Sequence, residues 1–232
     1  MSSRIIGNVL MNWLAFAATL LAGFLMSPFL VRHLGDAVYG VWVLIGSLAG
    51  YLGLLDFGIT PSIIKYTAEH RARGDQEAIN RVVTGGLAIY SAIGLGSIGI
   101  SAMVAFSFNS IFHSPLSSHT AASVVAIAGV NLAVTFPASV FVGVVRGYQR
   151  YDLDAGITSA NIAVRSFIVV FLILGGHGIL ALAVVTFAFD MVRLLYLIRA
   201  VYRLNPGIKL AREYLDWSQI KTLFGYSVYA FI

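Results

Sequence analysis

The sequence predicts an all-α membrane protein, a polytopic bundle of six complete transmembrane helices and the start of a seventh. Of its 232 residues, 59% are hydrophobic and only 11% are charged, and the mean hydropathy is +0.87. A water-soluble domain carries about 25% charged residues. Several apolar runs exceed the roughly 18 residues that a helix needs to cross the bilayer. These runs are apolar on every face, whereas the strands of a membrane barrel alternate, so the spans are helical.

The apolar runs set the expected elements in order. Six complete spans are expected at residues 8–31, 37–64, 82–108, 120–145, 156–174 and 178–198. A further apolar run starts at residue 223 and has about half the length of a span. We therefore expect a six-helix lobe over residues 1–200, a cytoplasmic linker over 201–222, and the truncated start of a seventh transmembrane helix over 223–232.

Three local features refine this picture. Residues 65–81 mix acidic and basic side chains, a pattern compatible with a short helical hairpin that turns at Gly74 and Asp75 or with a solvated loop. Pro61 and Pro137 fall inside expected spans, where each removes a backbone donor and bends its helix. The span at 82–108 is rich in glycine, which predicts close packing against its neighbours.

The distribution of Lys and Arg predicts that the N-terminus is cytoplasmic. The N-terminal segment and every second connection hold most of these residues, whereas the alternate connections offer only Arg32. The residues on the expected inner side are Arg4, Lys65, Arg71, Arg73, Arg81, Arg146, Arg150, Arg199, Arg203, Lys209, Arg212 and Lys221. The net charge of +5 reflects this bias and suits anionic membrane lipids, so it does not argue for a nucleic-acid partner.

Ionisable residues inside a membrane are expensive and therefore mark candidate functional sites. Arg165 is expected near the midplane, because it lies some 10 residues, or roughly 15 Å, from the inner end of its span. Asp190 in the next span is expected at a similar depth, so the two side chains are expected to meet. Arg193 lies one turn closer to the cytoplasm, where it can pair with Asp190 or extend to the interface. Asp56 is expected near the inner end of the second span.

Polar side chains fall in helical register with these charges. Asn161 shares a face with Arg165, Asn131 lies in the fourth span, and Asn12 lies in the first. Such stripes either line a hydrated cavity or bond helices to one another. For Arg165 the cavity is favoured, and a neutral pair with Asp190 is the alternative.

Chemistry that depends on metals, cofactors or thiols finds no support. The chain has no cysteine, and His113 and His119 lie in an expected outer connection without a third ligand. We expect no cofactor, no metal site and no catalytic residue.

Three stretches resemble the N-terminal lobe of Wzx-type oligosaccharide flippases, of the multidrug/oligosaccharidyl-lipid/polysaccharide exporter superfamily. They are Arg32-His33-Leu34-Gly35 followed by Tyr39-Gly40-Val41-Trp42, Leu55-Asp56-Phe57-Gly58-Ile59 leading to Lys65-Tyr66 and Gly74-Asp75, and Gly143-Val144-Val145-Arg146-Gly147-Tyr148-Gln149-Arg150. Their order and spacing cover nearly the whole chain.

The resemblance implies a transporter rather than an enzyme. Its members have two six-helix lobes around a cavity that faces each side of the membrane in turn. They move a lipid-linked oligosaccharide, usually on a polyprenyl pyrophosphate carrier, for polysaccharide biosynthesis. A bacterial inner-membrane location, a second lobe and other polysaccharide assembly proteins as partners follow from the same resemblance. Arg32 and Asp56, at opposite ends of the second span, are then expected at the gates.

Two other functions remain open. A multidrug or cation exporter of the same superfamily would be expected to have a cavity dominated by acids, whereas this chain places Arg165 and Arg193 against Asp190. A membrane polysaccharide polymerase or glycosyltransferase would need a sizeable catalytic loop, and the expected outer connections are short. Within the flippase interpretation, we expect Arg165 to attract the anionic pyrophosphate of the carrier, with Asp190 as its resting partner.

Overall fold

The computed structural model describes residues 2–112 and 116–231, and within these ranges it leaves the side chains of 2–12, 14, 15, 109 and 227–231 undescribed. The described residues form helices and no strand. The α-helices are α1 (Ser2–Leu34), α2 (Asp36–Gly53), α3 (Ile59–Arg73), α4 (Gln76–Phe112), α5 (Ser118–Gly147), α6 (Tyr151–Leu174), α7 (Ile179–Leu204) and α8 (Trp217–Phe231).

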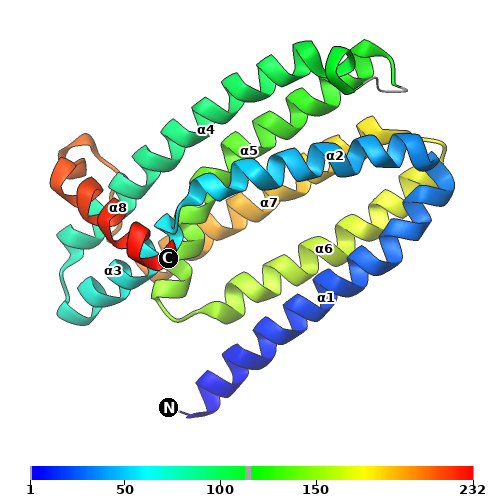
Figure 1. Ribbon diagram of the computed structural model, residues 1–232. Coiled ribbons are helices and arrows are strands. Elements are labelled where there is room, and N and C mark those ends of the chain that lie inside the picture. The colour runs from blue at the N-terminus through cyan, green and yellow to red at the C-terminus, as the bar shows by residue number, and fades with distance from the viewer. Residues whose placement is uncertain (1, 113–115, 232) are drawn as a thin grey trace.

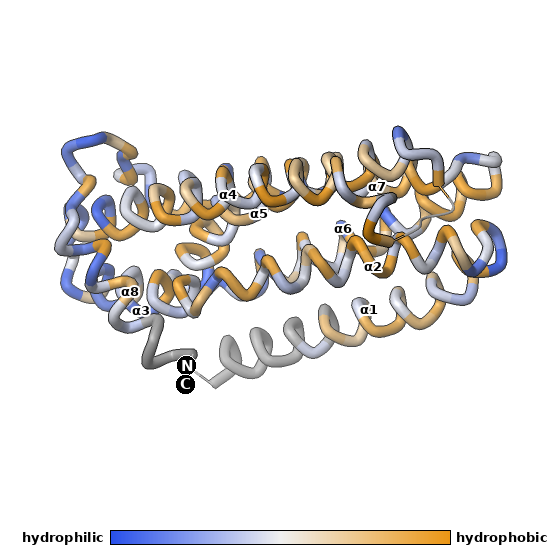
Figure 2. Tube along the Cα trace, turned by 45° about the horizontal axis from the view of Figure 1, so that its top comes forward, coloured by the Kyte–Doolittle hydropathy of each residue, from blue (hydrophilic) through white to orange (hydrophobic). Residues whose placement is uncertain are grey.

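Six helices in the described part are long and apolar enough to cross a membrane, which confirms the predicted helical bundle. The candidate spans are Phe16–Leu34, Asp36–Asp56, Gln76–Phe108, Ser118–Gly147, Tyr151–Leu174 and Ile179–Leu204. The long helices run side by side along one direction (Figure 1). Figure 2 shows that they are largely hydrophobic and that hydrophilic residues gather at their ends, most densely around α3 and α8.

The helices pack as neighbouring pairs that α7 connects. α4 lies along α5, α1 lies along α6, and α7 contacts both α5 and α6. A large apolar core joins α3, α4 and α5, and its central side chains Ile63, Val140 and Val144 are fully buried. Because α3 contributes to this core, it is an integral part of the lobe.

The second expected span is wrong in its last third. It was expected to continue to residue 64, but α2 ends at Gly53 and a 3-10 turn (Leu54–Asp56) follows. Phe57 and Gly58 then adopt positive φ angles of 44° and 78°, which breaks the helix before α3 begins. Pro61 therefore lies in the first turn of a new helix, where its missing N–H costs nothing and no bend results.

The connection between α3 and α4 is a helical hairpin, and the alternative of a solvated loop is wrong. Gly74 ends α3 with a φ of 69°, and Asp75 Oδ1 accepts a hydrogen bond of 2.9 Å from the N–H of Ala78 at the start of α4. A left-handed glycine followed by an acidic cap is a stable way to reverse the chain between helices.

Small residues permit the close approach of α3 to α5. A Cβ atom on Gly147 would lie 2.8 Å from Thr67 Cβ, and one on Gly143 would lie 2.7 Å from Ile63. In the glycine-rich α4, the predicted close packing holds at Gly94, where a Cβ atom would lie 2.9 Å from the Ala133 carbonyl oxygen. At Gly96 and Gly99 no neighbouring atom lies within 4 Å, so those two positions do not need glycine for packing.

The segment between α7 and α8 is docked on the bundle. Asn205 Nδ2 donates hydrogen bonds of 2.8 Å to Gln76 Oε1 on α4 and to the Tyr148 hydroxyl group after α5. Ile208 is buried in the core. α8 then packs on α3 and α4, and Ser62 Oγ donates to the Leu223 carbonyl oxygen at 3.0 Å. These contacts fix the position of α8 relative to α3.

Candidate functional site: the polar interior of α5, α6 and α7

Polar side chains in the middle of the bundle tie α7 to both of its neighbours. Asn131 Nδ2 on α5 donates a hydrogen bond of 2.9 Å to Asp190 Oδ2 on α7. Asn161 Nδ2 on α6 donates a hydrogen bond of 2.7 Å to the Phe189 carbonyl oxygen on α7. The structure therefore brings together three of the predicted site residues, each of which uses a polar group to bond helices.

A buried ion-pair cluster joins the same three helices near the N-terminus of α6. Asp154, in the first turn of α6, is almost completely buried. Its Oδ2 lies 2.6 Å from a terminal nitrogen of Arg146 on α5, and its Oδ1 lies 3.0 Å from Nη2 of Arg193 on α7. One carboxylate thus joins α5, α6 and α7, because each of its oxygens serves a different arginine.

Asp154 was not among the site residues predicted from the sequence, and Arg193 was predicted to have a different partner. Arg193 was expected to pair with Asp190 or to extend to the interface, but Arg193 crosses to Asp154 on α6. The expected span began at residue 156, so Asp154 was placed outside the membrane helix, although α6 begins at Tyr151. An acidic residue two positions before the predicted start, with arginines on both neighbouring helices, is the signal that could have identified it.

Arg165 lies on α6, one turn beyond Asn161, and it is partly buried. Among the described residues it makes no hydrogen bond or ion pair. The expected pairing with Asp190 is absent from this set of contacts, because the register of α6 against α7 separates the two side chains. Asn161 faces Phe189, so Arg165 lies about 6 Å further toward the α6–α7 turn. Asp190 lies on the other side of Phe189, toward the ion-pair cluster.

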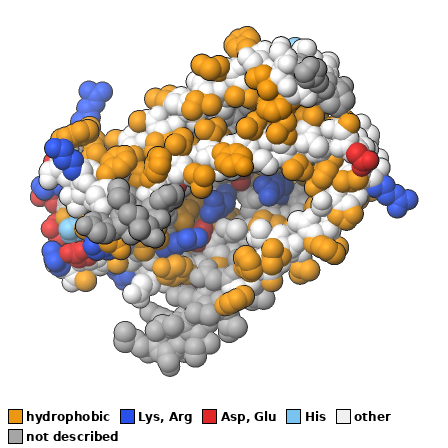
Figure 3. All heavy atoms as spheres, in the orientation of Figure 1, with side chains coloured by type: hydrophobic (Ala, Val, Ile, Leu, Met, Phe, Trp, Pro, Cys, Tyr) orange, Lys and Arg blue, Asp and Glu red, His pale blue; other side chains and the backbone are white. Residues whose placement is uncertain are grey.

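Figure 3 shows that Lys and Arg side chains lie in a recess in the middle of one face of the molecule, between apolar side chains of the helices above and below. The polar interior also contains buried atoms that have no partner among the described residues, namely Asn131 Oδ1 and Arg193 Nε. Buried polar atoms are usually bonded to protein or to ordered water. These two atoms can therefore bond to water or to another polar group.

The remaining predicted site residues lie apart from this interior. Asp56 follows α2 and accepts hydrogen bonds from the Tyr90 hydroxyl group and from Thr60 N and Oγ1, the last two at 3.3 Å. Arg32 is exposed in the last turn of α1, at the other end of α2. The side chain of Asn12 lies outside the described residues. The gating roles of Asp56 and Arg32 stay predictions.

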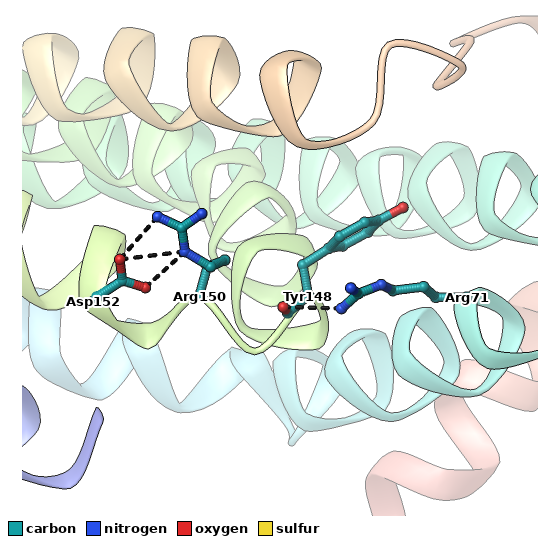
Figure 4. Close-up of polar contacts among 4 residues, drawn as sticks. All are labelled: Arg71, Tyr148, Arg150 and Asp152. Atoms are coloured by element: carbon teal, nitrogen blue, oxygen red, sulfur yellow. Dashed lines mark hydrogen bonds and ion pairs between the residues drawn. The ribbon is translucent and has the colours of Figure 1, made fainter. Parts of the chain in front are cut away.

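The third stretch of the resemblance forms a joint between α3, α5 and α6 (Figure 4). Arg71 Nη1 on α3 donates a hydrogen bond of 3.0 Å to the Tyr148 carbonyl oxygen, and its guanidinium group lies 4.5 Å from the centroid of the Tyr148 ring. Arg150 is bound by both oxygens of Asp152, at 2.9 Å from Nε and 2.9 Å from Nη2. The hydrogen bonds to Asp152 raise the pKa of Arg150, so its charge is retained.

Candidate metal ligands do not gather in the part of the chain that the structure describes, where no three His, Asp or Glu side chains are grouped. His113 lies outside the described residues, and His119 is exposed at the start of α5.

The six apolar helices define the class of the protein, which is a multi-pass membrane protein with a charged interior. The profile of the family described as "Polysaccharide biosynthesis protein" matches residues 5–232. The chain therefore belongs to that family, and the resemblance to Wzx-type transporters is confirmed.

The chain is also similar to a curated protein of Shigella flexneri that is described as "Putative O-antigen transporter". The two are 37% identical over 67 residues, which is 29% of this chain and 16% of that protein. The match thus spans about a sixth of the relative's length. No solved structure matches the chain.

Proposed function

We propose that this chain is a lobe of a flippase, which moves a lipid-linked oligosaccharide across the bacterial inner membrane by alternating access. Membership of the polysaccharide biosynthesis family supports this proposal, as does the similarity to a protein described as an O-antigen transporter. A second lobe and other polysaccharide assembly proteins are the expected partners, and a polyprenyl pyrophosphate-linked oligosaccharide is the expected substrate.

The observation that carries the proposal is Arg165, which is partly buried on α6 one turn from Asn161 and makes no ion pair among the described residues. Asp154 is shared by Arg146 and Arg193, and Asp190 is bonded by the neutral Asn131. Three arginines and two aspartates leave this region with one net positive charge. A guanidinium group offers a planar set of donors that fits phosphate oxygens, and the contact is stronger where water is excluded. The interior is thus suited to an anionic carrier.

The interior charges argue against one alternative function, and the short connections argue against the other. A multidrug or cation exporter needs acidic groups that a cation can reach, but both interior aspartates already have partners. A polymerase or glycosyltransferase needs room for catalytic groups. The connections of the described chain at the end away from α3 are short, with Gly35 alone between α1 and α2 and residues 175–178 between α6 and α7.

Deleting the full-length gene tests the transport function. We expect the surface glycan to disappear. The lipid-linked repeat unit should accumulate on the inner side of the membrane, where a label applied outside intact cells cannot reach it. Mass spectrometry of extracted lipids measures the accumulation, and a plasmid copy should reverse both effects. Loss of a polymerase would instead leave single repeat units on the cell surface, and that result would refute the transporter assignment.

The proposed orientation, with a cytoplasmic N-terminus, has a separate test. The chain has no cysteine, so single cysteines can be introduced at Ser118, near the α4–α5 connection, and at Ala72, exposed near the α3–α4 turn. An impermeant maleimide should label Ser118→Cys in intact cells and Ala72→Cys only after permeabilisation. The reverse pattern would invert the topology. Ala72 avoids the strain that a cysteine would meet at Gly74, where φ is positive.

A further inference from the structure

A basic pocket of about 290 Å³ lies where the turn between α5 and α6 meets the last turns of α7. Arg150, Arg199 and Arg203 line it together with Tyr196. Leu153, Ala200 and Leu204 complete the lining with apolar surface. The pocket is distinct from the interior that contains Arg165, and the proposed transport mechanism does not use it.

The arginines of the pocket carry more positive charge than the ion pairs of the described residues neutralise. Arg150 is bound to Asp152 at 2.9 Å. Arg199 and Arg203 have no ion pair among the described residues, and both side chains are exposed. They lie one turn apart on the same face of α7, where like charges repel one another. The nearby Asp154 is already occupied by Arg146 and Arg193. A bound anion would relieve this repulsion.

The position of the pocket along α7 corresponds to the headgroup layer of a membrane. Helix α7 has 26 residues, which gives a length of about 39 Å against a hydrocarbon core of about 30 Å. If the helix enters the core at Ile179, the core ends close to Arg199. Tyr196 is then at the interface, where tyrosine is enriched in membrane proteins. The apolar lining can contact acyl chains while the arginines contact the headgroup.

We propose that this pocket binds the headgroup phosphate of an anionic phospholipid in the leaflet at this end of the bundle. Arginine donors fit phosphate oxygens in pairs, and basic pockets between membrane helices bind anionic headgroups. The apolar part of the lining and the interfacial depth favour a lipid over free phosphate. The site is independent of the transport function proposed above, since it requires only that α7 crosses the membrane.

The test compares the purified full chain with Arg199→Gln/Arg203→Gln. Phosphatidylglycerol or phosphatidylcholine is titrated into the detergent solution, and native mass spectrometry counts the lipids retained. The unchanged chain should retain phosphatidylglycerol in preference to phosphatidylcholine. The double variant should bind phosphatidylglycerol roughly 30-fold more weakly, since each arginine near a headgroup contributes about fivefold.

The matched control is Arg212→Gln/Lys221→Gln, which removes the same charge from exposed positions outside the pocket. Its affinity for phosphatidylglycerol should stay within about threefold of that of the unchanged chain, a small loss expected for charges outside the site. Equal losses in both double variants would show diffuse surface charge and overturn the site. Equal retention of the two lipids would overturn it as well.

Two further arms keep the test decisive. Millimolar inorganic phosphate should not displace phosphatidylglycerol. If phosphate raises the melting temperature of the chain while no lipid is retained, the lipid assignment is wrong. The single variants Arg199→Gln and Arg203→Gln serve if the double variant is not monodisperse. Each should lose about fivefold in affinity, and no loss in either would refute the proposal.

Discussion

Replacing Asp154 by alanine should lower the melting temperature of the purified chain by roughly 6–12 °C. The substitution leaves Arg146 and Arg193 beside a buried space without a counter-charge. Removing one partner of a buried ion pair typically costs about 3 kcal/mol or more. The lower value applies because the two arginine side chains are 37% and 27% exposed and can reach water, whereas the aspartate side chain is 4% exposed. Intrinsic tryptophan fluorescence during heating in one detergent measures the effect.

Asp152 provides a matched control for this substitution. It lies in the same first turn of α6, so both aspartates interact with the same helix dipole, and it also pairs with an arginine. Its side chain is 40% exposed, and an exposed pair contributes about 0–1 kcal/mol. Asp152→Ala should therefore change the melting temperature by at most about 4 °C. Equal effects of the two substitutions would contradict the structural role assigned to the buried cluster.

Asp154→Asn separates charge from hydrogen bonding at the same position. The amide oxygen can still accept a hydrogen bond from one arginine, but the negative charge is lost. We expect the melting temperature of Asp154→Asn to lie between those of the unchanged chain and of Asp154→Ala. A melting temperature equal to that of the unchanged chain would show that the charge of Asp154 contributes little.

Arg165→Ala in the full-length protein should reduce glycan export by roughly 30-fold without lowering the amount of protein in the membrane. Hydrogen bonds to charged groups contribute about 2 kcal/mol, which corresponds to this factor. The substitution removes no ion pair that the described residues make, so the bundle should remain folded. Export is measured by complementation of the gene deletion, and abundance is measured by immunoblotting of isolated membranes.

Two companion variants define what the arginine does. Arg165→Lys keeps the charge but loses the planar set of donors, so we expect partial export. Arg165→Ala/Asp190→Ala should remain as defective as the single variant, because Asp190 is bonded to Asn131 rather than to Arg165. Recovery of export in that double variant would mean that Arg165 only neutralises Asp190. Its proposed contact with the carrier would then be wrong.

The location of the candidate site was accessible from the sequence. Arg165, Asp190 and Asn161 stand out because a charged or strongly polar side chain in an apolar span is costly. Their helical register places them on particular faces of α6 and α7. The partners of these residues were harder to predict from the sequence. Depth along a helix restricts which residues can meet, but the relative rotation and register of the helices decide which of them do. Asp190 contacts Asn131, and Arg193 contacts Asp154, for this reason.

The break after α2 was also hidden in the sequence. Residues 54–64 continue the apolar composition of the second span, so hydropathy alone extended the helix through them. The break depends on the positive φ angles of Phe57 and Gly58. Phenylalanine rarely adopts that conformation, and the packing of Ile59 and Ile63 into the core with α5 stabilises it here.

The sequence by itself determined the membrane class, the number of spans and the family resemblance. These properties depend on the length of apolar runs and on local motifs, because the bilayer requires each span to satisfy its own backbone hydrogen bonds. Only the tertiary structure decided that α3 is a separate helix in the core, that Asp154 joins three helices, and that Arg165 has no partner in the described part of the chain. Those outcomes depend on the contacts between helices, which a pattern along one helix does not specify.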